Sequence, residues 1–133
     1  MIIFLDFDGT VVEHDYPRIG RENPGAFQVI EKLQKANHDI ILNTARRDAE
    51  DNTFEEALEY LNFHPYYDRI NITRYCNKLY PKRWNWDEMK KENVIFIDDL
   101  TPDIPLKQGI QKSRDMVDWR ELDEQFVLQG IYP

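Results

Sequence analysis

Short apolar runs alternate along the chain with segments of helical periodicity. Residues 2–5, 40–42 and 94–97 are uninterrupted apolar runs, each followed by polar residues that can end a strand. Such runs are typical of strands in a parallel sheet, because these strands are buried on both faces. A weaker alternation predicts another strand over 66–72, and 115–117 weakly indicates one more. The pattern predicts an α/β fold, a Rossmann-like parallel sheet with helices on both faces.

The helical segments begin at residues that commonly cap helix amino ends. These caps are Asn23 followed by Pro24, Thr53 with Glu56, Asn85, and Asp118 with Glu121. Their side-chain oxygens can accept the N–H groups that the first helical turn leaves without partners. We therefore expect a helix to begin just after each cap, and we expect Gly130 to end the last one.

Acidic and hydroxyl side chains stand where the predicted strands end. Asp6 and Asp8 follow the first run, Thr44 follows the second, and Asp98 with Asp99 follows the third. Parallel strands end at one common edge of a sheet, which is where open α/β sheets bind ligands. The first two aspartates are two residues apart and point to the same side, where they repel unless a cation or a proton lies between them. Their oxygens are ligands that Mg²⁺ prefers, so the sequence predicts a magnesium site.

The string Asp6-Phe7-Asp8-Gly9-Thr10 resembles the first motif of the haloacid dehalogenase superfamily, whose members are mostly Mg²⁺-dependent phosphohydrolases. The resemblance implies a phosphatase that forms an aspartyl-phosphate on Asp6, with Asp8 as general acid and base. It also implies that the backbone carbonyl of Asp8 touches the metal and that Asp98 is a direct ligand, with Asp99 in support. The expected metal-binding set is therefore Asp6, Asp8, Asp98 and Asp99.

Two side chains that follow the second predicted strand are candidates for binding the phosphoryl group. Thr44 offers a hydroxyl donor, although an isolated threonine at a strand end more often acts as a cap. Arg46 lies near enough to reach a substrate phosphate, although Arg47 beside it makes a solvated pair equally consistent with the sequence. We expect Thr44 to be a catalytic and substrate-binding residue and Arg46 to bind substrate.

The resembling family also uses a lysine upstream of the last motif, and four residues here are candidates. Lys82 lies just ahead of the predicted cap Asn85, at the helix end expected beside the strand termini, and we favour it for that reason. Lys78 lies in the same loop. Lys90 and Lys91 require the helix prediction in this region to be wrong.

No stretch of the chain is long enough to hold a cap domain. About a dozen residues separate Thr10 from the first predicted helix, and a similar number follow Thr73, whereas domains rarely have fewer than about 50 residues. An open site predicts either a large substrate or a second subunit that covers it, with segments 11–20 and 73–85 as the walls. Of these we favour a homo-oligomer, because an acidic surface repels polyanionic macromolecules.

The composition bounds the partners of this chain. It has 133 residues, 41% of them hydrophobic, a net charge of −8 and a pI near 4.8. These values predict a single domain over residues 1–133 that takes a phosphorylated substrate of unknown identity and does not bind nucleic acid, which needs a basic patch. No run is long enough to span a membrane, and no signal peptide pattern follows Met1. The one cysteine, Cys76, fits a reducing cytoplasm, where we expect the protein to act.

Two other classes of function are consistent with parts of the pattern. A receiver-type signalling domain also clusters aspartates, threonine and lysine. Receivers, however, carry the phosphorylated aspartate on the third strand, whereas the third predicted strand here, 66–72, ends in Ile-Asn-Ile. A binding module without catalysis is disfavoured because Asp6 and Asp8 are both present. His14, His38 and His64 show no ligand spacing, so a histidine metal site is not expected.

Overall fold

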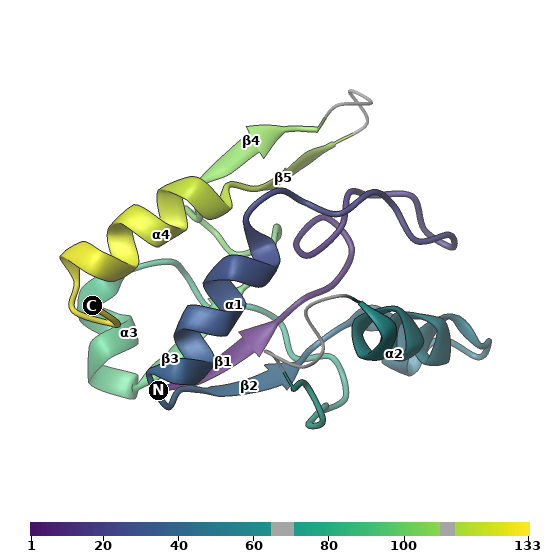
Figure 1. The fold of residues 1–133 in the computed structure, drawn as a ribbon, viewed down its shortest axis with the longest axis horizontal. Helices are drawn as coiled ribbons and strands as arrows, with labels where there is room; N and C mark the ends of the chain where they lie inside the picture. The colour runs from purple at the N-terminus through teal and green to yellow at the C-terminus, as the bar shows by residue number, and fades with distance from the viewer. Residues whose placement is uncertain (65–70, 110–113) are drawn as a thin grey trace.

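The three apolar runs form one parallel sheet in the computed structural model, which describes residues 1–64, 71–109 and 114–133. The strands are β1 (Ile2–Leu5), β2 (Asp39–Leu42) and β3 (Val94–Ile97). Their order is β2-β1-β3, so the strand that carries the first motif is the central one. All three run the same way and end in register, which confirms the predicted parallel α/β fold (Figure 1).

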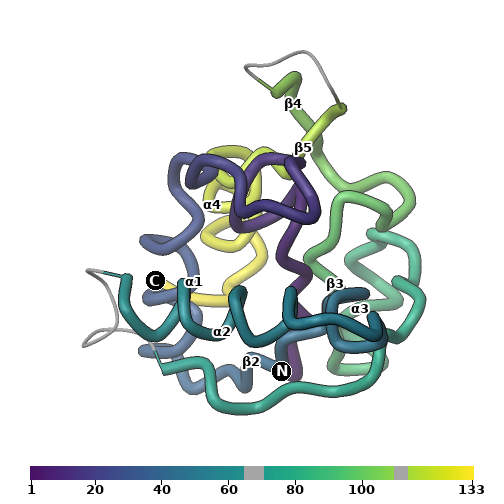
Figure 2. Tube along the Cα trace, turned by 90° about the vertical axis from the view of Figure 1, so that its right-hand side faces the viewer, coloured from purple at the N-terminus to yellow at the C-terminus, as the bar shows by residue number. Residues whose placement is uncertain are grey.

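One face of this sheet is fully buried against two helices. Its side chains, each at most 6% exposed, are Ile3, Leu5, Ile40, Leu42, Ile95 and Ile97. They form a core with the apolar stripes of α1 (Ala26–Lys35) and α4 (Trp119–Leu128), which contact each other. The helix α3 (Trp86–Glu92) lies on the other side of the strands (Figures 1 and 2). Burying a large apolar side chain contributes about 1.5–3 kcal/mol, so this face accounts for much of the fold's stability.

The remaining elements lie toward the carboxyl end of the sheet. The helix α2 (Thr53–Phe63) lies beyond the carboxyl end of β2 (Figure 1). Two short antiparallel strands, β4 (Leu106–Gln108) and β5 (Asp115–Val117), form a hairpin, so the weak strand signal at the second of them is confirmed. The first was not predicted, because its side chains are mostly exposed and show no buried pattern.

The strand predicted over 66–72 falls almost wholly outside the described residues. Asn71 and Ile72, its described end, are not in a strand. A little further on, the chain does run beside β2: the Leu42 amide donates to the carbonyl of Arg74 at 2.9 Å, and the Cys76 amide donates to the carbonyl of Leu42 at 3.2 Å. This pairing brings the loop after residue 73 back toward the carboxyl end of the sheet.

Two of the four predicted caps are confirmed. Asn85 accepts the N–H of Glu88, and Asp118 accepts the N–H of Glu121. Gly130, with a φ of 70°, adopts the left-handed conformation expected just after the last helix.

The other two predicted caps are wrong because hydrogen bonds to other groups hold their side chains. Asn23 donates to the carbonyls of Thr10 and Val117, at 2.9 and 2.8 Å, and so ties the first loop to β5. The helix after it begins two residues later than predicted, capped by Gly25. Thr53 is the first residue of its helix rather than the cap, and its amide and hydroxyl both donate to Asp51.

The described residues contain no cap domain. Between Thr10 and α1, and again from residue 71 to α3, the chain forms irregular loops with isolated bridges. None of the described helices combines the length and the apolarity needed to cross a bilayer.

Candidate functional site

Three carboxylates meet at the carboxyl end of the sheet. Asp6 follows β1, and Asp98 and Asp99 follow β3, which is the neighbouring strand. One oxygen from each lies within 4.8 Å of the others, and Asp6 and Asp98 are buried. Three hard oxygen ligands this close together suit a cation such as Mg²⁺, so this acidic triad can hold a metal ion.

Among the lysines that the structure describes, Lys78 contacts the acidic triad. Its ammonium donates to Asp98 Oδ2 at 2.7 Å, to Asp6 Oδ1 at 3.4 Å and to the carbonyl of Asn43 at 3.2 Å. Lys82, which the sequence favoured, points away and pairs with Glu92 at 3.0 Å on the surface, where its side chain is 67% exposed. Lys82 therefore does not lie at the acidic triad, and the prediction that favoured it is wrong.

Lys90 and Lys91 also lie away from the triad, in the last turn of α3. The helix prediction that made them poor candidates is correct, since α3 covers both. The premise that failed is that the lysine must stand at the helix start. A loop that returns along β2 delivers the lysine instead.

Asn43 holds the loop that carries Lys78. This fully buried residue follows β2, and its side-chain amide exchanges two hydrogen bonds with the backbone of Leu79, at 2.8 and 3.0 Å. Through these two bonds the Asn43 side chain pairs with the backbone of Leu79 as the backbone of a neighbouring strand would. Sequence reasoning missed this role, although an amide directly after a buried strand is the signal that could have suggested it.

Asp8 faces a different partner from the other aspartates. Arg46 binds both of its carboxylate oxygens, from Nε and from Nη2, each at 2.7 Å. The remaining N–H groups of Arg46 donate to the carbonyls of Pro17, Arg18 and Thr53 at 2.7–3.2 Å. A guanidinium has five N–H donors, and all five are used here.

This arrangement bears on two predicted roles. Arg46 is 1% exposed, so it has no N–H free for a substrate phosphate in this geometry. It instead ties Asp8 to the loop at residues 17–18 and to the first residue of α2. The side chain of Asp8 lies outside the acidic triad, so the contact of its backbone carbonyl with a metal, which the resemblance implies, stays a prediction.

Thr44 lies in the wall of the site and also acts as a cap. Its hydroxyl oxygen accepts the N–H of Arg46 at 3.2 Å and so caps the short 3₁₀-helix Ala45–Asp48. The residue is buried and lines the same cavity as Asp6 and Lys78. A hydroxyl can accept one hydrogen bond and donate another, so the cap leaves its proton available to a ligand.

His14 is a site residue that the sequence reasoning passed over. Its Nε2 lies 3.0 Å from Asp99 Oδ2, on the outer side of the acidic triad. This approach is possible because Gly9, with a φ of 75°, has no side chain: a Cβ there would lie 2.1 Å from His14 Nε2 and 2.9 Å from Asp99 Cγ. A search for histidines at regular spacing could not find a residue that meets its partner only in the fold.

Gly9→Ala should destabilise the protein more than Gly130→Ala. Both glycines have positive φ, which costs an L-residue about 1–2 kcal/mol, but only the first position also has a clash, since nothing lies within 4 Å of a Cβ at Gly130. Urea unfolding followed by far-ultraviolet ellipticity measures both free energies. Equal losses for the two variants would show that the space at Gly9 is not needed.

The charges of the triad perturb one another strongly. Burial, and then the charges of Asp98 and Asp99 against the opposing effect of Lys78, raise the pKa of Asp6 well above its ordinary value of 3.8. Burial would also raise the pKa of Asp99, but hydrogen bonds with His14 and Asp6 hold it below its ordinary value. Burial would lower the pKa of Lys78, but Asp6 and Asp98 together raise it. Three clustered carboxylates beside one lysine give the site an excess of negative charge, which favours the binding of a cation.

The raised pKa of Asp6 predicts that the metal-free protein becomes less stable as the pH rises. Above pH 3.8 the unfolded chain releases this proton while the folded protein keeps it, so the free energy of unfolding falls as pH rises toward the folded-state pKa. In excess chelator at pH 7, Asp6→Asn should therefore unfold at a higher temperature than the parent. The difference should shrink toward pH 4, and a variant less stable than the parent at pH 7 would contradict the expectation.

A cavity of about 410 Å³ opens over these groups. The residues that line it are Asp6, Asp8, His14, Tyr16, Thr44, Ala45, Arg46, Lys78, Asp99, Leu100 and Arg114. Its volume is within the range of small-molecule sites. Asp6, Asp8, Thr44, Arg46 and Asp99 of the sequence-predicted site residues therefore share one cavity. Lys82 does not line it, and neither does Asp98, which is fully buried.

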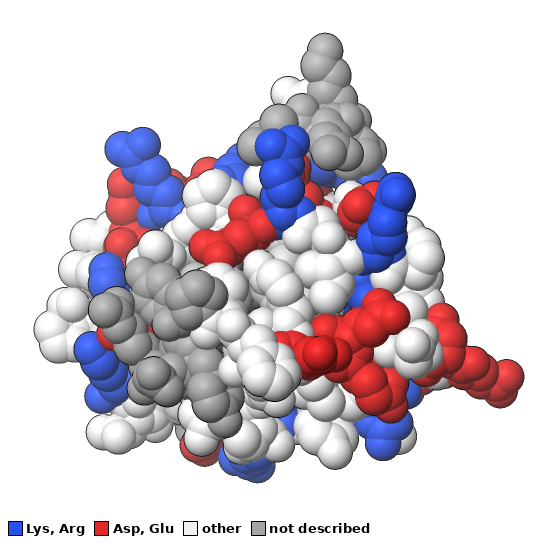
Figure 3. Space-filling view, turned by 45° about the vertical axis from the view of Figure 1, so that its right-hand side comes forward, with Lys and Arg blue, Asp and Glu red and all other residues white. Residues whose placement is uncertain are grey.

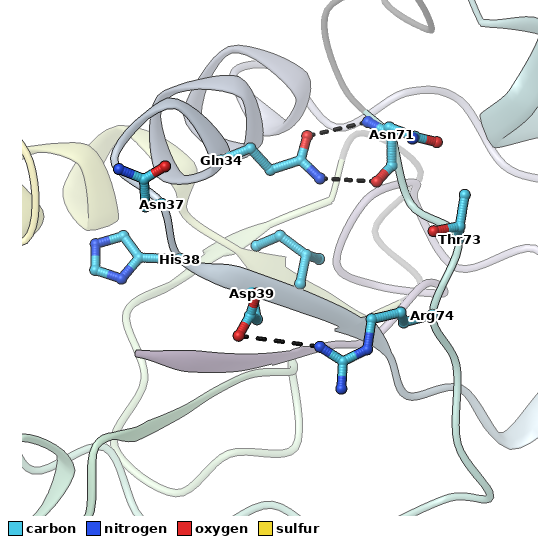
Figure 4. Close-up of a pocket in the computed structure, with 8 residues that line it drawn as sticks. Gln34, Asn37, His38, Asp39, Asn71, Thr73 and Arg74 are labelled. Atoms are coloured by element: carbon cyan, nitrogen blue, oxygen red, sulfur yellow. Dashed lines mark hydrogen bonds and ion pairs between the residues drawn. The ribbon is translucent and has the colours of Figure 1, made fainter.

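A second cavity of about 440 Å³ lies at the amino end of β2, away from the acidic triad (Figure 4). Gln34 spans it by exchanging two hydrogen bonds with the backbone of Asn71, at 3.0 and 3.1 Å. Arg74 lies 3.9 Å from Asp39 across the strand. These contacts join α1 and β2 to residues 71–74, so we assign this cavity a structural role.

No protein-family model and no curated protein matches the chain. Among solved structures, it is similar to a conserved protein from Bacteroides thetaiotaomicron, with 27% sequence identity and a TM-score of 0.42. The similarity covers 70% of this chain and 91% of the other. What the chain itself shows is a parallel α/β fold with a buried acidic triad that can hold a metal ion.

Proposed function

We propose that this chain is a Mg²⁺-dependent phosphohydrolase that hydrolyses phosphomonoesters through an aspartyl-phosphate on Asp6. The observation that carries the proposal is the acidic triad in contact with Lys78, beside a fourth aspartate, Asp8, that the buried Arg46 orients. A cation site next to a further carboxylate and a lysine suits phosphoryl transfer, in which catalysis is mostly positioning and charge stabilisation.

The residues of the triad fit a magnesium ion by their chemistry. All three are carboxylates, which are hard oxygen ligands, and their oxygens lie close enough together to share one ion. When bound, the ion would offset the negative charge that otherwise repels a phosphate and would stabilise the charge that develops during transfer. In this proposal Asp98 is the main anchor, and His14 orients Asp99 from the outer side.

The first half of the reaction transfers the phosphoryl group to the protein. A carboxylate oxygen of Asp6 attacks the phosphorus atom, the bond from phosphorus to the ester oxygen breaks, and Asp8 gives a proton to the leaving oxygen. Lys78 and the hydroxyl of Thr44 face the same cavity and would bind the phosphoryl oxygens.

The second half hydrolyses the aspartyl-phosphate. Asp8 takes a proton from a water molecule, the water oxygen attacks phosphorus, and the bond to Asp6 breaks to release phosphate and restore the carboxylate. Each carboxylate oxygen has two lone pairs, so Asp8 can exchange a proton toward the cavity while Arg46 holds it from the other side. We therefore propose that Arg46 positions Asp8 and does not bind substrate.

A direct test measures phosphate release from a panel of phosphomonoesters with Mg²⁺ and with excess chelator. We expect turnover with Mg²⁺ and none with the chelator. Asp98→Asn should raise the Mg²⁺ concentration for half-maximal activity by more than about tenfold, because the ion loses a ligand. Full activity in excess chelator, or no release from any ester of the panel, would refute the proposed function.

A further inference from the structure

Part of the cavity over the acidic triad has an apolar wall. Tyr16, Ala45 and Leu100 line it together with the charged residues, and they come from the loops after β1, β2 and β3. The charged floor suffices for a phosphoryl group, so the apolar wall faces whatever the phosphoryl group is attached to. Ligand sites commonly combine a few placed polar groups with an apolar lining of this kind.

Tyr16 presents an aromatic ring that is already held in place. Its hydroxyl donates to Asp51 Oδ2 at 3.2 Å, and the guanidinium carbon of Arg46 lies 5.1 Å from the ring centroid. Arg46 is in turn 5.2 Å from the ring of Phe7, so the tyrosine is the outer layer of a stack that begins in the core. The residue is nevertheless 51% exposed. A pre-ordered ring loses little conformational entropy when a ligand stacks on it.

Leu100 supplies a second apolar contact from the neighbouring strand end. It directly follows Asp98 and Asp99, and its amide donates to Asp98 Oδ1 at 2.9 Å, so its backbone is fixed relative to the triad. Its side chain is 58% exposed and lines the cavity. An exposed leucine alone means little, but this one shares a small cavity with an exposed, fixed aromatic ring.

The charges near the apolar wall disfavour an anionic leaving group. Asp51, which holds Tyr16, belongs to a run of exposed acidic residues that continues into α2, and Figure 3 shows acidic side chains gathered on this side of the molecule. Arg114 also lines the cavity, but it lies 3.9 Å from Asp99, whose charge it offsets. A second phosphate or a carboxylate beside Tyr16 would therefore be repelled.

We infer that Tyr16 and Leu100 form the subsite for the leaving group, and that the substrates are phosphomonoesters of an uncharged, planar aromatic group. The inference rests on the proposed function, because that function places the phosphoryl group on the charged floor. It adds what the acidic triad cannot specify, namely the chemistry of the alcohol that is released.

Binding of three phosphonates tests the subsite without turnover. Benzylphosphonate, cyclohexylmethylphosphonate and ethylphosphonate share one anionic head, and the first two differ mainly in planarity. Calorimetry in the presence of Mg²⁺ should show benzylphosphonate binding about tenfold more tightly than ethylphosphonate, with the cyclohexyl compound between them. Tyr16→Ala and Leu100→Ala should each reduce the preference for the benzyl compound, whereas Tyr16→Phe should keep it.

The matched control is Tyr80→Ala, which removes a tyrosine that is 89% exposed and does not line the cavity. The preference of this variant for benzylphosphonate over ethylphosphonate should equal that of the parent. Equal affinities of the parent for benzylphosphonate and ethylphosphonate, or no binding of either, would overturn the subsite.

Hydrolysis of benzyl phosphate and ethyl phosphate separates the two proposals. Release of phosphate from both at equal kcat/KM, unchanged by Tyr16→Ala, would leave the phosphatase and remove the subsite. Tight, Tyr16-dependent binding of benzylphosphonate without any hydrolysis would keep the subsite and remove the phosphatase.

Discussion

Asp6→Asn is expected to lower kcat for phosphomonoester hydrolysis by about 10⁴-fold or more, because an amide cannot attack phosphorus as a carboxylate does. The fold should survive, since the substitution removes a charge that is buried among other carboxylates. Steady-state phosphate release and far-ultraviolet ellipticity measure the two effects. Beryllium fluoride, which mimics a phosphoryl group on a carboxylate, should bind the parent and not the variant.

The control for this variant is Asp39→Asn. Asp39 is an exposed aspartate at the amino end of β2, so the same chemical change is made away from the acidic triad. Its activity should match that of the parent. Turnover by Asp6→Asn within tenfold of the parent, with deamidation back to aspartate ruled out by mass spectrometry, would exclude Asp6 as the nucleophile.

Lys78→Met is expected to lower kcat by about 10²–10³-fold, the usual effect of removing one group that stabilises the charge of a transition state. The variant should also unfold at a lower temperature than the parent when no metal is present, because Asp6 and Asp98 lose their shared cation. Added Mg²⁺ should then raise its unfolding temperature by more than it raises that of the parent. Steady-state kinetics and thermal unfolding with and without Mg²⁺ measure these changes.

The matched control is Lys82→Met, the same substitution four residues away. Because that side chain is largely exposed and pairs with Glu92 on the surface, kcat should stay within about twofold of the parent. The comparison decides between the residue that the sequence favoured and the residue that contacts the acidic triad. A large loss in Lys82→Met with a small loss in Lys78→Met would reverse the assignment.

The proposed mechanism depends on where the charge of the site is balanced. Lys78 lies between two carboxylates of the triad, whereas Arg46 is used entirely in holding Asp8 and nearby carbonyls. Lys78 and Arg46 thus have different tasks in the site. One is half-buried beside the proposed nucleophile and can turn to a phosphoryl oxygen, and the other is fixed in the wall.

Local signals in the sequence sufficed for the sheet and for the acidic triad. Short apolar runs of three or four residues are typical of buried parallel strands, and residues directly after parallel strands share one edge by geometry. That rule alone predicted that Asp6, Asp98 and Asp99 lie together, although they are far apart in the sequence. The caps at Asn85 and Asp118 were predictable for a similar reason, since a cap contacts an amide only a few residues away.

Contacts between distant segments had no such local signal. Lys78 reaches the triad because Asn43 holds the backbone of its loop, His14 reaches Asp99 through the space that Gly9 leaves, and Arg46 finds Asp8 from the next strand end. Asn23 failed as a cap because its amide bonds to two carbonyls, one of them more than ninety residues away. Sequence spacing determined which residue types stand at the strand ends. Tertiary structure alone decided which charges neutralise one another, because that depends on how irregular loops pack over the sheet rather than on any periodic pattern.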